Sequence, residues 1–157
     1  MLEMKMKNGG TVCIELDEAA APLTVANFEK LVRQGFYDGL TFHRVISGFM
    51  IQGGDPDGTG TGGAPENVKG EFSANGWSNP LKHQRGVISM ARANNPNSAS
   101  SQFFIVHEDS LFLDGSYAAF GKVVSGMEEV DRIAALPTGS QDRPLEPVVI
   151  EALKVVE

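Results

Sequence analysis

Cysteine is nearly absent from this sequence, since Cys13 is the only one in 157 residues, and no internal disulfide can form. A lone thiol is typical of a reducing compartment. No apolar run approaches the length of a membrane span, and the N-terminal residues lack the apolar region of a signal peptide. These absences predict a cytoplasmic protein without a membrane segment. They also make Cys13, which lies in the alternating run 11–16, a packed structural residue rather than a catalytic one.

Basic residues are in the minority, with 13 Lys and Arg against 20 Asp and Glu, for a net charge of −7. A nucleic-acid binder needs a basic face, so we predict no nucleic-acid partner. Hydrophobic residues make up 41% of the chain and charged residues 21%, which is typical of a globular protein. The length and the even composition predict one domain over residues 1–157.

Familiar catalytic machinery is also missing. The three histidines, His43, His83 and His107, do not have metal-ligand spacing, and the chain contains no Gly-x-Ser-x-Gly sequence. Residues 58–63 match the G-x-G-x-x-G pattern of nucleotide sites, but no helical period follows them. We therefore interpret 58–63 as a surface loop, keep a nucleotide-binding enzyme only as a minor alternative, and predict neither a metal nor a cofactor.

Glycine, by contrast, is frequent. The chain contains 18 glycines and short apolar runs, a pattern that favours strands and turns. Asn8-Gly9-Gly10 predicts a hairpin turn between strands at 1–7 and 11–16. The remaining pattern predicts helices at 22–34 and 127–136, and strands at 41–46, 49–53, 86–92, 101–106, 117–124 and 148–156. This order favours a closed antiparallel barrel with helices over its ends, although periodicity does not separate a barrel from a sandwich.

The run 42–55 is the first segment that could carry chemistry. Strand alternation predicts Phe42, Arg44 and Ile46 on one face and His43 on the other. Arg44 then lies among apolar side chains, where an unpaired charge is costly. Two interpretations stay open at this point: an arginine that snorkels from a barrel edge, or a guanidinium held over an apolar pocket.

Two further strands each place an amide beside a large apolar side chain. Alternation pairs Met50 with Gln52 and Gln102 with Phe104. On spacing alone, core packing with two amides at the rim is the favoured interpretation.

Residues 42–55 and 101–105 resemble the two signature segments of the cyclophilin family, and shorter matches lie at 90–91, 113–115 and 120–123 in the family's order. The resemblance covers nearly the whole chain. It implies a mainly β fold, an eight-stranded antiparallel closed barrel capped by two α-helices. It also implies peptidyl-prolyl cis-trans isomerase activity, which requires no covalent intermediate and assists protein folding.

The resemblance also implies roles for individual residues. Arg44 is the expected catalytic arginine, and Gln52 is expected to position it. The expected substrate-binding residues are Phe49, Met50, Ala91, Arg92, Gln102, Phe104, Phe112, Leu113 and Tyr117.

Three of these positions depart from the commonest pattern of the family. Phe112 replaces a tryptophan, Tyr117 a histidine and Arg92 an asparagine. The expected partners are proline-containing peptides and folding proteins, bound by a monomer, and cyclosporin with reduced affinity because Phe112 has no N–H donor. The alternative is a binding module or holdase of the same fold with little catalysis.

Overall fold

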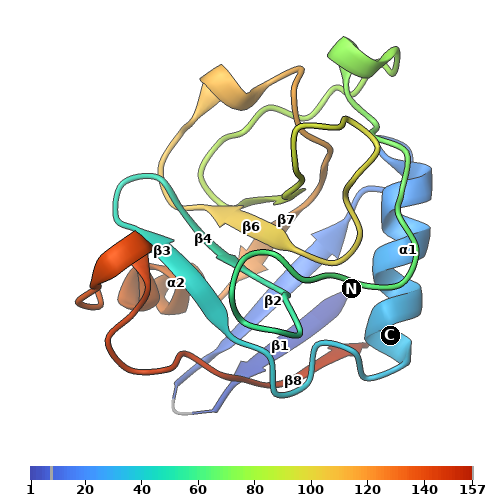
Figure 1. Cartoon of the computed structure of the whole chain (residues 1–157). Helices are drawn as coiled ribbons and strands as arrows, with labels where there is room; N and C mark the ends of the chain where they lie inside the picture. Colours follow the sequence, from blue (N-terminus) through green and yellow to red (C-terminus); the bar gives the residue numbers. More distant parts are fainter. Residues whose placement is uncertain (8, 157) are drawn as a thin grey trace.

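Eight strands form one antiparallel sheet in the computed structural model, which describes residues 1–7 and 9–156 (Figure 1). The strands are β1 (Leu2–Met6), β2 (Thr11–Leu16), β3 (Phe42–Ile46), β4 (Met50–Gly53), β5 (Val87–Met90), β6 (Phe103–Val106), β7 (Ala119–Ser125) and β8 (Ile150–Val155). The α-helices are α1 (Pro22–Arg33) and α2 (Met127–Ala134), and short 3-10 turns are η1 (Ser73–Asn75), η2 (Leu111–Leu113) and η3 (Ser140–Asp142). The helices and strands predicted from the pattern therefore have counterparts in the structure with small shifts at their ends. The predicted turn at Asn8-Gly9 includes Asn8, which lies outside the described residues.

The sheet curls so that its first and last strands approach each other. The strand order is β3-β4-β6-β5-β7-β2-β1-β8, and each neighbouring pair is antiparallel. The edges meet through an isolated bridge between Thr41 and Val149, beside a 3.0 Å hydrogen bond from the Phe42 N–H to the Val148 carbonyl. The predicted mainly β fold with eight strands and two helices is confirmed. Full closure was overstated, because β3 and β8 do not pair along their lengths.

Helix α1 covers one side of the curled sheet (Figure 1). It packs on the sheet through aromatic side chains. Pro22 occupies the first turn, where backbone N–H groups have no acceptor within the helix, so the N–H that proline lacks is not needed. Gly35 follows the end of the helix with a φ of +73°. Phe28 is fully buried, and its ring lies 4.8 Å from Tyr37, 5.4 Å from Phe103 and 4.9 Å from Phe120. These contacts join the helix to β6 and β7.

A second, smaller apolar cluster lies on the opposite face of the same strands. In β4 and β6 the side chains of Ile51 and Phe103 enter the main core, whereas Met50 and Phe104 belong to the outer cluster. Alternation along two paired strands produces this division, since successive side chains point to opposite faces. The outer cluster forms the floor of the candidate site.

One predicted face assignment was wrong. The β3–β4 register shifts between Phe42, which pairs with Gly53, and Arg44, which pairs with Gln52. Because this irregularity adds a residue on β3, Phe42 joins the main core while Arg44 and Ile46 lie on the outer side. His43 is 6% exposed. Simple alternation does not predict such a shift.

None of the helices within residues 1–7 and 9–156 combines the length and the apolar character needed to cross a membrane.

Candidate active site

A hollow of about 130 Å³ opens over the outer apolar cluster. It is lined by Arg44, Phe49, Met50, Gln52, Ala91, Arg92, Phe104, Leu113 and Tyr117. Nine of the predicted site residues therefore meet in one place, although they come from distant segments of the chain. Pockets for drug-sized ligands measure about 300–1,000 Å³, so this hollow suits one compact apolar group.

The other two predicted residues lie beside the hollow rather than in it. Gln102 precedes β6 and lines a neighbouring hollow with Ala91 and Arg92. Phe112 is 76% exposed, and its ring centroid lies 5.6 Å from that of Phe49. Phe112 therefore extends the apolar rim towards solvent.

Three amide or carbonyl groups lie in line behind Arg44. The Gln102 Nε2 donates to the Gly62 carbonyl at 2.8 Å, the Gln52 Nε2 donates to the Gln102 Oε1 at 3.0 Å, and the Arg44 guanidinium approaches the Gln52 Oε1 at 3.4 Å. A carbonyl only accepts and a guanidinium only donates, so the two ends fix the orientation of both glutamine amides. We call this series the amide relay; it directs an acceptor at Arg44.

The relay ends on the glycine-rich loop that resembles a nucleotide motif. The carboxylate of Asp55 accepts backbone N–H groups from Asp57, Thr59, Gly60 and Gly62 at 2.6–3.1 Å. Burial acts to raise the pKa of Asp55, but these four donors outweigh it and lower the pKa. The loop is thus wrapped around an internal anion and holds the Gly62 carbonyl in place, as expected of a shaped surface loop.

The side chain of Arg92 packs against one side of the hollow. Its guanidinium lies 5.0 Å from the ring centre of Phe72 and 4.9 Å from that of Tyr117. It also donates to the Ser116 carbonyl from Nε at 3.1 Å and Nη2 at 2.7 Å. Cation–π contacts of this kind stabilise by about 0.5–2 kcal/mol, so Arg92 holds the Tyr117 wall in place.

Phe104 is supported from behind by His83. The two rings stack with centroids 5.9 Å apart, and His83 is 1% exposed. The His83 Nδ1 lies 2.8 Å from the Asp114 Oδ1, and its Nε2 lies 2.9 Å from the Ser89 Oγ. The order of these groups resembles a hydrolase triad, but Ser89, which pairs with Phe104 across β5 and β6, is fully buried and offers no surface to a substrate. The set instead joins the Leu113–Asp114 segment to the back of the pocket wall.

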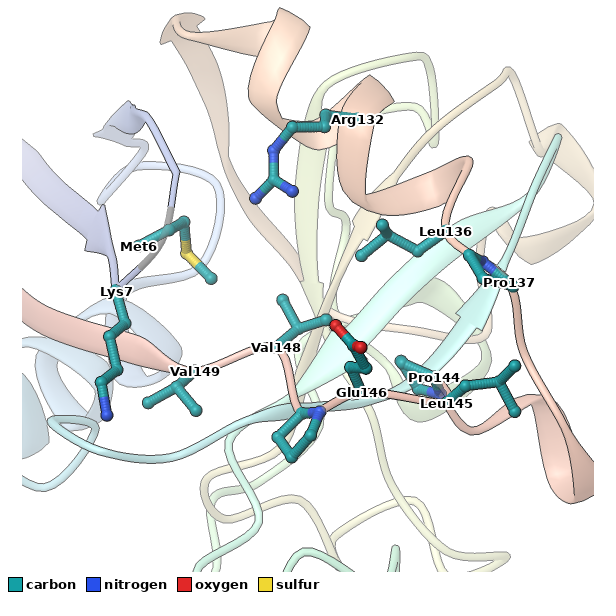
Figure 2. Close-up of a pocket in the computed structure, with 11 residues that line it drawn as sticks. Met6, Lys7, Arg132, Leu136, Pro137, Pro144, Leu145, Glu146, Val148 and Val149 are labelled. Carbon is teal, nitrogen blue, oxygen red and sulfur yellow. The ribbon is translucent and has the colours of Figure 1, made fainter.

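A larger hollow of about 260 Å³ lies elsewhere, between the segment after α2 and residues 144–149 (Figure 2). Leu136 and Val148 face it, and Lys7 and Arg132 stand at its margins. The Arg132 guanidinium is already bound by the Glu129 carboxylate at 2.6 and 2.8 Å. This hollow shares no lining residue with the candidate site.

The part of the chain that the structure describes has no group of three or more histidine, cysteine or acidic side chains placed to hold a metal ion. A shallow apolar hollow flanked by an arginine and amides is chemically suited to hold part of a peptide chain.

Comparison with known proteins identifies the family of this chain. A family model described as cyclophilin type peptidyl-prolyl cis-trans isomerase/CLD matches residues 1–155. The chain is 53% identical over 123 residues to peptidyl-prolyl cis-trans isomerase B of Bacillus subtilis, covering 78% of this chain and 82% of the relative. It is 46% identical over 149 residues to peptidyl-prolyl cis-trans isomerase-like 1 of Gibberella zeae, covering 94% of this chain and 90% of the relative.

A solved structure agrees with these relatives. The crystal structure of a Cryptosporidium parvum cyclophilin type peptidyl-prolyl cis-trans isomerase, determined in the presence of the dipeptide Ala-Pro, superposes with a TM-score of 0.90. The two chains are 33% identical, and the match covers 99% of this chain and 98% of that one. The chain belongs to the cyclophilin family of peptidyl-prolyl cis-trans isomerases. It is an enzyme that isomerises X–Pro peptide bonds.

Several supporting residues were not found by sequence reasoning. They are Asp55, which acts through backbone contacts within its own loop, and His83 and Ser89, which join Asp114 from a segment further along the chain. Their only sequence signal was the presence of Asp55 and Asp114 inside the runs that resemble the family.

Proposed function

We propose that the 130 Å³ hollow is the proline-binding pocket and that Arg44 is the group that lowers the isomerisation barrier. The observation that carries the proposal is that Arg44 lines the same hollow as the apolar side chains of Met50, Phe104 and Leu113. In this arrangement the apolar walls hold the proline ring while the rest of the peptide turns.

The chemistry explains why an arginine suits this place. Rotation about a peptide bond breaks amide resonance, with a barrier of about 18–20 kcal/mol. In the twisted state the proline nitrogen becomes pyramidal and gains a lone pair that can accept a hydrogen bond. A donor aimed at this nitrogen stabilises the transition state and not the planar ground state. The guanidinium supplies a rigid fork of such donors and remains charged.

Arg44 is not sufficient by itself. A rate gain on the order of 10⁵ requires about 7 kcal/mol of differential stabilisation. One charged hydrogen bond contributes about 1.5–3 kcal/mol net. The partly dry pocket and the anchoring of the proline ring supply the rest, and the amide relay lowers the cost of orienting the guanidinium.

The proposed substrates are proline-containing peptides and folding protein chains. The Cryptosporidium relative was crystallised in the presence of Ala-Pro, and the neighbouring hollow lined by Gln102 offers amide and carbonyl groups to the peptide beside the proline. We further propose that the protein acts as a monomer in the cytoplasm, where its single cysteine would stay reduced.

NMR exchange spectroscopy on an Ala-Pro peptide tests the proposed site. Catalytic amounts of protein should produce cis-trans exchange cross-peaks that are absent without it, and an excess of a second proline peptide should suppress them. Exchange that is lost in a folded variant with the pocket filled, such as Ala91→Leu, supports the site. Exchange that persists unchanged in that variant would place the reaction elsewhere.

A further inference from the structure

The turn between β3 and β4 carries Phe49 into the proline pocket, and one residue holds this turn from two sides. His107 follows the end of β6. Its backbone N–H donates to the Phe49 carbonyl at 2.8 Å, and its Nδ1 accepts the Gly48 N–H at 2.9 Å. Gly48 has a φ of +80°, a conformation that side chains disfavour, so the turn depends on local contacts to keep its shape.

The two ring nitrogens of His107 have different partners. Because the Gly48 N–H is a donor, Nδ1 must be free of a proton to accept it. The proton of the neutral ring then lies on Nε2, which is 3.1 Å from the Asp131 Oδ1. The geometry thus selects one tautomer of a neutral imidazole.

Asp131 is itself held in place. The Arg85 guanidinium donates to both of its oxygens at 2.7 Å and also to the His107 carbonyl at 2.9 Å. This bidentate pair lowers the pKa of Asp131, since the hydrogen bond from Arg85 and its positive charge both favour the carboxylate. Helix α2, the segment before β5 and the end of β6 therefore converge on the His107 ring, whose side chain is 15% exposed.

We infer that His107 is a positioning residue for substrate binding: its neutral ring fixes the 48–49 turn and thereby the Phe49 wall of the pocket. It does not touch the reacting bond. Loss of its Nδ1 acceptor should loosen the wall that holds the proline ring and weaken peptide affinity more than turnover. This inference rests on the proposed pocket.

Matched substitutions separate the two contacts of the ring. In His107→Asn the side-chain oxygen takes the place of Nδ1, whereas His107→Gln places its polar group near Nε2 and leaves the Gly48 N–H without a partner. Titration of an Ala-Pro peptide followed by NMR line-shape analysis yields Kd and the exchange rate on the enzyme. We expect His107→Gln and His107→Leu to raise Kd about three- to tenfold, the effect of one neutral hydrogen bond, with the bound exchange rate changed less than twofold. His107→Asn should stay within twofold of the wild type.

The wild-type protein offers a readout that does not depend on the folding of any variant. Its ¹⁵N imidazole spectrum should show His107 as the Nε2–H tautomer, and a proton on Nδ1 would overturn the inference. Equal Kd values for the Gln, Leu and wild-type proteins would also overturn it. Phe104→Ala separates this inference from the proposed function: if Phe104→Ala leaves Kd unchanged the pocket is misplaced, whereas weakened binding there with no effect of His107→Leu refutes only the role of His107.

Discussion

Replacing Arg44 with alanine is the most direct test of the proposed mechanism. Arg44 is exposed on the outer side of β3, and its side-chain hydrogen bond to Gln52 is long at 3.4 Å. Surface substitutions of this kind change stability by about 0.5 kcal/mol or less. The variant should therefore fold normally, and any large loss of activity would reflect chemistry rather than unfolding.

The expected loss follows from the one interaction removed. A charged hydrogen bond contributes about 1.5–3 kcal/mol, so kcat/KM should fall about tenfold to 150-fold. Arg44→Lys keeps the positive charge but not the planar fork that meets the Gln52 Oε1, and it should lie between the wild type and the alanine variant. Gln52→Met breaks the amide relay and should cost less than Arg44→Ala, since the guanidinium remains but is no longer oriented.

A protease-coupled assay on an Ala-Pro peptide measures these rates, and urea unfolding of each variant provides the control for folding. Wild-type kcat/KM in a folded Arg44→Ala protein would refute the role of Arg44. Equal activity of the lysine variant and the wild type would show that the positive charge is enough and that the planar fork of donors is not required. A double variant, Arg44→Ala with Gln52→Met, should lose little more than Arg44→Ala alone, because the relay acts through the arginine.

The remaining predictions concern the pocket wall, an inhibitor and pH. Phe104→Ala removes a wall that is only 5% exposed and should weaken both peptide binding and turnover; unchanged affinity in a peptide titration would make Phe104 a core residue alone. Phe112→Trp restores an N–H donor on the rim and should tighten cyclosporin binding about fivefold to a hundredfold while changing peptide isomerisation much less, and equal cyclosporin affinity by calorimetry would contradict this. Burial lowers the pKa of His83 against the opposing effect of Asp114, so below about pH 6.5 the unfolded chain binds a proton that the folded chain resists. The contribution of His83 to the free energy of unfolding is therefore present above that pH and declines as the pH falls towards 5, a window above the titration of carboxylates. Urea unfolding at pH 7.5 and 5.5 should show a smaller decline in stability for His83→Gln than for the wild type. Equal declines would contradict the assignment.

Local patterns were enough to predict the elements of this fold. The helix at 22–34 was visible from its apolar period and its flanking Pro22 and Gly35, and the structure begins α1 at Pro22 and ends it at Arg33. Strand alternation likewise placed Met50 with Gln52 and Gln102 with Phe104 on shared faces. These features depend on neighbours within a few residues, so they can be read from the chain directly. The roles of the site residues came from the resemblance to a family and not from the pattern.

Contacts between distant segments decided the rest. The register shift between β3 and β4 places Phe42 in the main core, and the edges of the sheet meet at the bridge between Thr41 and Val149. The amide relay needs Gln52, Gln102 and Gly62 to converge from three segments, and the last two are 40 positions apart in the chain.

The histidines illustrate the same limit most clearly. As a sequence they were three isolated residues without metal spacing. Folding stacks His83 against Phe104, buries His43 at the register shift within β3 and sets His107 between a turn and a helix. A hydrogen bond depends on positions in space to within tenths of an ångström, and only the tertiary structure brings residues separated by dozens of positions to that precision.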